Sequence, residues 1–87
     1  MGRQRGVRVG KEGRCVLRPS FGSSSSDLFD VDCDEQTIGR VARRDGGWQA
    51  MLPHGGCSVN GFYEIGPVFA RQRDAVAETW INRHEEI

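Results

Sequence analysis

The sequence predicts a small α+β protein: a three- to four-stranded antiparallel sheet with one C-terminal helix packed on one face, preceded by a flexible basic N-terminal tail. Three observations predict it. Polar and apolar residues alternate over residues 28–52, a turn signal interrupts them at 45–47, and apolar residues near the end recur at helical spacing. Because 87 residues suffice for one domain only, we expect the tail over 1–26 and the folded domain over 27–87.

Residues 1–26 have the composition of a linker. Four glycines fall within the first 13 residues, and four consecutive serines occupy 23–26. Low hydrophobicity and frequent glycine make ordering costly, so a flexible segment is the simplest interpretation. Residues 6–9 and 15–17 remain open as short edge strands that pair only within the folded protein.

The sheet is expected to begin with a strand over 28–33 and a second strand over 37–44. Ile38 and Val41 have opposite parity on the second strand, so both can face the core only if a bulge falls at Gly39. The Asp-Gly-Gly run at 45–47 predicts a tight hairpin into a third strand over 48–52.

The C-terminal part should complete the sheet and cover it. Residues 62–65 and 67–70 form either one strand broken at Gly66 or two short strands. A helix over 72–85 is predicted from the apolar stripe of Val76, Trp80 and His84, joined by Ala77 and Ile81.

Charge is strongly segregated although twelve basic residues balance twelve acidic ones. Residues 1–18 hold six basic residues and one acidic residue, a net charge of +5, whereas 27–35 hold five acidic residues and no base. Residues 36–87 are neutral, with six of each sign. The basic segment either binds nucleic-acid phosphates or folds back on the acidic segment.

One sheet face is expected to remain open. Arg40, Gln49 and Met51, with Arg43 or Arg44 depending on the bulge, have the parity opposite to the core. Arginine and glutamine can make paired hydrogen bonds to base edges in a major groove. The alternative is a solvated face whose long side chains cover apolar surface.

Residues 39–50 and 68–77 together resemble the arm-type N-terminal DNA-binding domain of phage and transposon tyrosine integrases. In that family a basic strand, an Asp-Gly turn and a Trp-x-Ala strand precede a Phe that ends the last strand and then a helix with a Glu-Ala-x-x-Trp pattern. Here Trp48 and Ala50 match the strand, Phe69 matches the strand end, and the helix pattern is approximated by Asp74, Ala75 and Trp80. The resemblance spans residues 37–84 and implies a three-stranded sheet with one helix. It also implies DNA binding by the sheet face, but it carries over no recombination.

Other chemistry has weaker support in the sequence. His54 and Cys57 have half of a zinc-knuckle spacing that Cys15 and Cys33 could complete, but no Cys-x-x-Cys pair exists. Three cysteines are more simply read as reduced thiols, with Cys33 as a small core residue. We therefore expect no metal, no cofactor, no small-molecule substrate and no enzymatic activity.

The sequence thus predicts a cytoplasmic nucleic-acid-binding protein, with DNA as partner, that acts as an accessory or regulatory protein of a phage or mobile element. No apolar run is long enough for a membrane span. The expected nucleic-acid-binding residues are Arg3, Arg5, Arg8, Lys11, Arg14, Arg40, Arg43, Arg44 and Gln49. The alternative is a protein-interaction module for a host or phage protein, with binding residues Asp30, Asp32, Asp34 and Glu35.

Overall fold

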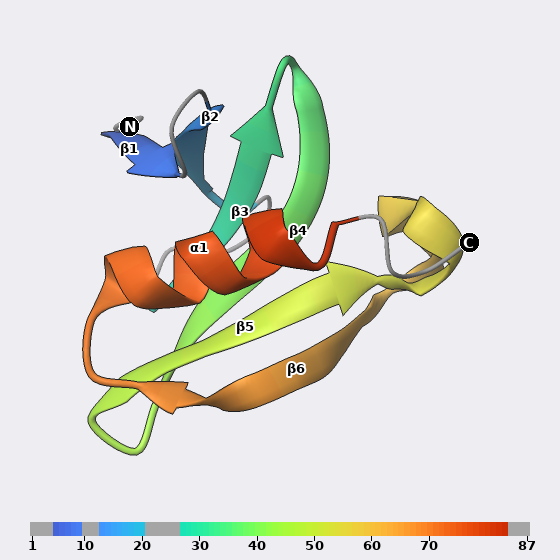
Figure 1. Ribbon diagram of the computed structural model, residues 1–87. Helices are drawn as coiled ribbons and strands as arrows, with labels where there is room; N and C mark the ends of the chain where they lie inside the picture. The colour runs from blue at the N-terminus through green and yellow to red at the C-terminus, as the bar shows by residue number, and fades with distance from the viewer. Residues whose placement is uncertain (1–4, 10–12, 21–26, 84–87) are drawn as a thin grey trace.

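A computed structural model describes residues 5–9, 13–20 and 27–83. They form a six-stranded antiparallel sheet in which each strand pairs with its neighbours in sequence, followed by one α-helix (Figure 1). The elements are β1 Arg5–Val9, β2 Gly13–Pro19, β3 Leu28–Cys33, β4 Gln36–Arg44, β5 Gly47–Pro53, the 3-10 turns η1 His54–Gly56 and η2 Ser58–Asn60, β6 Phe62–Phe69 and α1 Gln72–Ile81.

The prediction of three to four strands behind a flexible tail was wrong, because residues 5–19 form two further strands of the sheet. β1 pairs with β2, and β2 pairs with β3. Val7, Cys15 and Leu17 are at most 7% exposed. Burial of these side chains offsets the entropy cost of ordering a glycine-rich segment, and a disulfide between Cys15 and Cys33 ties β2 to β3.

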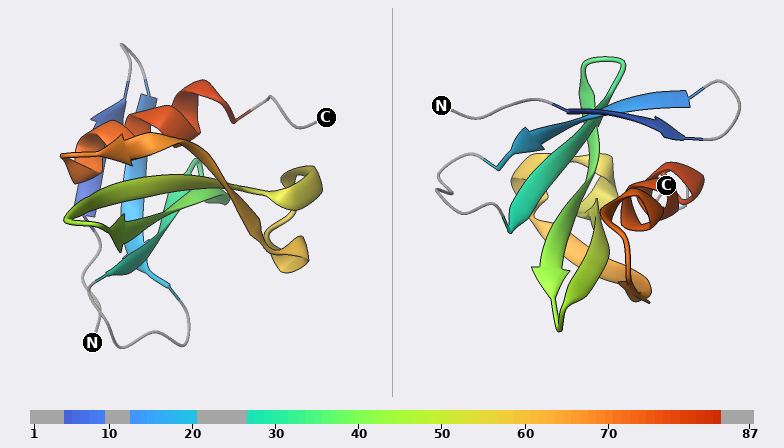
Figure 2. Two further views of the ribbon diagram at one scale, coloured as in Figure 1. Left: turned by 90° about the horizontal axis from the view of Figure 1, so that it is seen from below. Right: turned by 90° about the vertical axis from the view of Figure 1, so that its left-hand side faces the viewer.

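The sheet curves around the helix. Figures 1 and 2 show α1 against one face of the sheet, and it contacts β1, β4, β5 and β6. The core lies between them and includes Val31, Val41, Ala50 and Val76, each fully buried.

The hairpin predicted at 45–47 is confirmed. Arg44 pairs with Gly47, and the two residues between them have positive φ, 51° at Asp45 and 77° at Gly46. Both central residues of a type I′ turn require this left-handed backbone, which aspartate tolerates and glycine adopts freely.

The predicted bulge lies next to Gly39 rather than at it. The β3–β4 register shifts between Val31 and Asp32, which leaves Ile38 as the extra residue of β4. A glycine is needed at position 39 because β5 and α1 pack closely against it, and its backbone does not have positive φ. A Cβ there would lie 2.6 Å from the Met51 carbonyl oxygen and 2.9 Å from the Thr79 Cβ.

The helix is present but its described part ends earlier than expected, at Ile81. Thr79 is fully buried against β4, whereas Ile81 is 70% exposed, so the predicted apolar stripe was wrong at that position. The absent side chain of Gly39 admits Thr79 to the interface and turns Ile81 outward. His84 lies outside the described residues.

Candidate functional site

The sheet face opposite the helix carries a row of charged side chains across three strands. Arg18 on β2, Asp30 on β3 and Arg40 on β4 lie side by side in the register. Arg40 Nε donates to Asp30 Oδ1 at 2.9 Å, and Arg18 Nη2 lies 3.3 Å from Asp30 Oδ2. Asp30 is only 7% exposed, so its charge is held between two guanidinium groups.

A second carboxylate extends this network. Arg18 Nε donates to Asp32 Oδ2 at 2.8 Å, and Thr37 Oγ1 donates to Asp32 Oδ1 at 2.7 Å. The hydrogen bond to Asp32 raises the pKa of Arg18 above its ordinary value. Burial by itself would raise the pKa of Asp32, but the hydrogen bonds from Arg18 and Thr37 and the charge of Arg18 together lower it.

The other two arginines predicted on the sheet face are also paired. Arg43 Nε lies 3.2 Å from Asp27 Oδ1, and its guanidinium stands 4.8 Å from the centre of the Trp48 ring. Arg44 Nη1 lies 2.6 Å from Glu64 Oε2. A nucleic-acid phosphate would have to compete with an existing carboxylate at each of these arginines.

Gln49 is buried rather than open to a groove. It is 5% exposed, and its Nε2 donates to the carbonyl oxygens of Ile65 at 2.8 Å and Gly66 at 3.1 Å. These bonds satisfy carbonyls at the β5–β6 register shift that follows Gln49. Its amide therefore serves the fold, and the structure does not bring it together with the basic side chains.

Three of the predicted N-terminal basic residues, Arg5, Arg8 and Arg14, lie on strands β1 and β2. Arg8 lies directly opposite Arg14 in the register, and the Arg14 side chain is exposed. Arg5 lies opposite Leu17. Within the part of the chain that the structure describes, Arg14 makes no ion pair. Arg3 and Lys11 lie outside the described residues.

The predicted acidic binding residues separate into two groups. Asp30 and Asp32 belong to the charged row, whereas Asp34 and Glu35 are exposed in the β3–β4 turn. β3 lies between β2 and β4, so both of its edges are hydrogen-bonded and it has no free edge for a partner strand.

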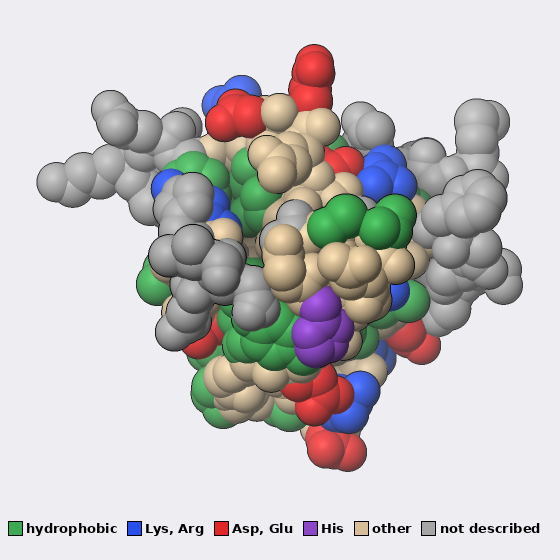
Figure 3. Space-filling view, turned by 90° about the vertical axis from the view of Figure 1, so that its right-hand side faces the viewer, with side chains coloured by type: hydrophobic (Ala, Val, Ile, Leu, Met, Phe, Trp, Pro, Cys, Tyr) green, Lys and Arg blue, Asp and Glu red, His purple; other side chains and the backbone are tan. Residues whose placement is uncertain are grey.

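The cysteines are not all reduced thiols. Cys15 and Cys33 form the buried disulfide, and Cys57 is exposed with a free thiol. Two of the four candidate zinc ligands are therefore unavailable to a metal, and across residues 5–9, 13–20 and 27–83 no three metal-ligating side chains cluster. The ring centre of His54 lies 4.9 Å from that of Tyr63. Figure 3 shows a histidine side chain, in purple, on the face that it draws.

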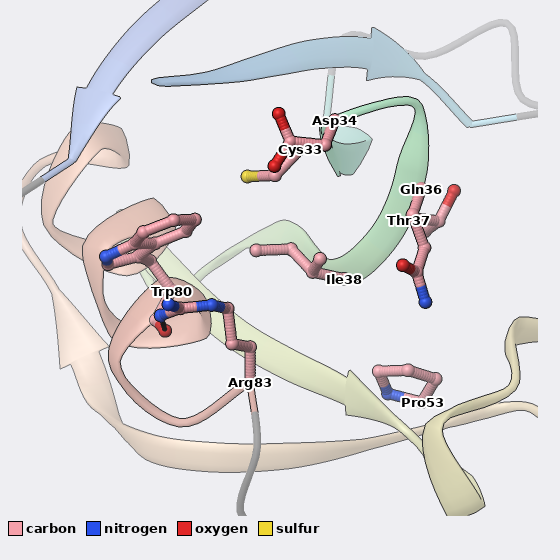
Figure 4. Close-up of a pocket in the computed structure, with 8 residues that line it drawn as sticks. All are labelled: Cys33, Asp34, Gln36, Thr37, Ile38, Pro53, Trp80 and Arg83. Atoms are coloured by element: carbon pink, nitrogen blue, oxygen red, sulfur yellow. Dashed lines mark hydrogen bonds between the residues drawn. The ribbon is translucent and has the colours of Figure 1, made fainter. Parts of the chain in front are cut away.

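A pocket of about 350 Å³ opens between the end of α1, the start of β4 and the end of β5. Figure 4 shows Trp80 and Arg83 on one side of it and Gln36 on the other, with Ile38 between. The Arg83 guanidinium stands 3.5 Å from the Trp80 ring centre, and its Nη1 donates to the Trp80 carbonyl oxygen at 2.5 Å. This site was not predicted from the sequence, although Trp80 and Arg83 have the i, i+3 spacing of side chains that meet on a helix.

No protein-family model, curated protein sequence or solved structure matches this chain. Over the described residues, no helix has the length and apolar character needed to cross a membrane.

Proposed function

We propose that this chain is a non-enzymatic nucleic-acid-binding protein, with DNA as the expected partner, whose main contact surface is the β1–β2 hairpin. The observation that supports this surface is the distribution of ion pairs. Arg18, Arg40, Arg43 and Arg44 each have a carboxylate within 3.3 Å. The other basic residues of 1–18 are five against one acid, a net charge of +4.

A basic two-stranded ribbon suits a polyanion. Arginines on adjacent strands can reach successive phosphates along a nucleic-acid backbone. If about five phosphates are neutralised, log K should fall against log salt concentration with a slope of about −4 to −5. The paired arginines of the sheet face would then add little, because each phosphate contact there costs an existing ion pair.

The test uses charge reversals in the full chain. Truncation to 27–87 is unsuitable, because it removes Val7, Cys15 and Leu17 from the core. The double variant Arg8→Glu, Arg14→Glu is compared with Arg71→Glu, Arg73→Glu, which changes net charge equally at two exposed positions at the start of α1.

Fluorescence anisotropy of a labelled nucleic acid at several salt concentrations measures the outcome. The hairpin variant should lose most of its affinity, and its salt slope should be shallower by about 2. The α1 variant should keep the parent slope. Equal losses in both variants, or no binding by the parent at low salt, would refute the proposal.

The role in a phage or mobile element and the cytoplasmic location stay predictions. The Cys15–Cys33 disulfide bears on the location, because such bonds persist mainly in oxidising compartments. Cells are quenched in acid, the free thiols are alkylated under denaturing conditions, and the mass of the protein is measured, which distinguishes an oxidising compartment from the reducing cytoplasm. One labelled cysteine indicates an intact disulfide, and three labelled cysteines indicate the reducing cytoplasm.

A host or phage protein is the second candidate partner. The observation that favours it is Val59 on η2, which is 86% exposed beside the exposed Cys57. A complex with one polypeptide that withstands high salt and is lost in Val59→Asp would support this function. It would also separate it from salt-sensitive nucleic-acid binding.

A further inference from the structure

We infer that the pocket between α1 and β4 accepts a base of a single-stranded nucleic acid, so that the partner of the β1–β2 hairpin is a single strand rather than an intact duplex. This inference rests on the proposed function and deepens it. The pocket volume of about 350 Å³ lies near the lower limit of ligand sites, which suits one flat ring.

One wall of the pocket offers a stacking surface. The Trp80 indole is half-buried, and the Arg83 guanidinium stands 3.5 Å from its ring centre, so the guanidinium covers that face of the indole and offers its own outer face at the end of α1. Bases stack on aromatic rings and on guanidinium planes, and this stacking tolerates any base identity. Ile38 lies between this wall and the Gln36 side, and Pro53 adds an apolar group across the pocket (Figure 4).

The opposite rim offers hydrogen-bonding groups. Gln36 and Asp34 are exposed at the β3–β4 turn and line the pocket. The Thr37 hydroxyl is occupied by Asp32, so the amide of Gln36 and the carboxylate of Asp34 are the groups available to a base edge. The same carboxylate would repel the phosphates of a free nucleotide, which favours a base whose phosphates lie elsewhere.

The hairpin provides the place for those phosphates. Cys33 lines the pocket and is bonded to Cys15, which directly follows the exposed Arg14. Arg8 lies opposite Arg14, and both have the parity opposite to the buried Val7 and Cys15, so their positions lie on the sheet face away from α1, at the same end of the sheet as the pocket. A strand could therefore place one base in the pocket and pass its backbone around this end of the sheet to the hairpin. A paired and stacked base in a duplex cannot enter such a pocket without being flipped out.

The experiment uses the full chain carrying Trp48→Phe, which leaves Trp80 as the only tryptophan. It is titrated with a single-stranded oligothymidylate, an oligouridylate, a DNA duplex of equal length and thymidine monophosphate. The single strands should quench Trp80 emission and bind more tightly than the duplex, and the mononucleotide should bind far more weakly. The two single strands decide between DNA and RNA as the source of the base.

Pocket variants then locate the contact. Trp80→Ala and Arg83→Ala should each weaken single-strand binding by about 5- to 100-fold, since stacking of a base is sensitive to such truncation. Trp80→Phe should keep most of the affinity. The matched control Arg73→Ala, at the exposed start of the same helix, should stay within about 2-fold of the parent. Because Trp80 also packs against the core, Gln36→Ala serves as a further pocket variant at an exposed position.

The possible failures are distinguishable. If pocket variants match the control, or the duplex binds as tightly as the single strand, the pocket inference is overturned while the hairpin proposal stands. Mononucleotide binding as tight as that of the strand would also overturn it. If no nucleic acid binds at low salt, both the pocket inference and the proposed function fail.

Discussion

Reduction of the Cys15–Cys33 disulfide should lower the free energy of unfolding by about 3 kcal/mol. The two cysteines are separated by 18 residues. Closing a loop of that length removes roughly 11 cal/mol/K of chain entropy from the unfolded state, which corresponds to about 3 kcal/mol at 25 °C. A chain of this size has a total stability of roughly 4–13 kcal/mol, so the loss is a large share.

The strand pairing also indicates which part of the protein should lose stability first when the disulfide is reduced. Besides the disulfide, β2 is held to β3 by pairing from Val16 to Pro19. Strands β3–β6 and α1 keep a core of their own around Val41, Ala50 and Val76. Reduction should therefore increase hydrogen exchange in β1 and β2 before it does so in β4 and β5.

Urea unfolding in the presence and absence of reductant measures the change, in a Cys57→Ser background that removes the exposed thiol. Circular dichroism and tryptophan fluorescence should both report a lower midpoint after reduction. The variant Cys15→Ala, Cys33→Ala should be indifferent to reductant. An unchanged midpoint, with complete reduction verified by mass, would refute the reasoning and show that packing alone holds the hairpin.

Three further substitutions probe the packing and the charged row. Gly39→Ala should cost about 1–3 kcal/mol in thermal unfolding, and adding Thr79→Ala should not restore it, because the Met51 carbonyl still obstructs the new Cβ. Folding lowers the pKa of Asp32, so the ionised Asp32 stabilises the folded state above a pH of about 4, and this contribution is lost in more acid solution. Asp32→Asn should therefore make the free energy of unfolding less dependent on pH in the acid range. Asp30→Asn should leave Arg40 without a carboxylate while Arg18 keeps Asp32, lower stability by about 1–2 kcal/mol in urea unfolding, and strengthen nucleic-acid binding at low salt in anisotropy.

The elements with local signals could be predicted from the sequence. The Asp45–Gly46 turn needs positive φ at both positions, and those residue types reveal it. The helix from Gln72 likewise follows from residues close together in the chain. Both the turn and the helix are determined by residues that are close in the sequence, and sequence patterns report such local relations.

The N-terminal hairpin could not be predicted in this way, because its stability is nonlocal. Its glycines and arginines have the composition of a linker, and only burial of Val7 and Leu17 against the rest of the core, with the Cys15–Cys33 bond, makes ordering favourable. One signal for a strand was present in the sequence. Cys15 and Leu17 are apolar and two positions apart, as are the inward-facing residues of the strand that begins at Leu28.

The sheet-face residues show a different limit. The alternation of side chains along β4 correctly predicts that Arg40 faces outward. It does not predict which residue of the neighbouring strand lies beside Arg40. The partner Asp30 is fixed by register, and the register depends on the extra residue Ile38. Gln49 also has the outward parity, but the register shift beside it buries its amide against two carbonyls.

These pairings decide which surface can attract a polyanion. An arginine held by a buried carboxylate contributes little to the field outside the protein, because the two charges cancel over the distance at which a phosphate approaches. The five described ion pairs therefore balance the charges of Arg18 and of three of the six arginines of residues 36–87, namely Arg40, Arg43 and Arg44. The described residues of the β1–β2 hairpin hold four arginines and no acidic residue, and the disulfide that joins this hairpin to β3 also fixes it beside the pocket. Charge and stacking surface are thus coupled through one covalent bond, so reduction should weaken single-strand binding more than it weakens binding to a simple polyanion such as heparin.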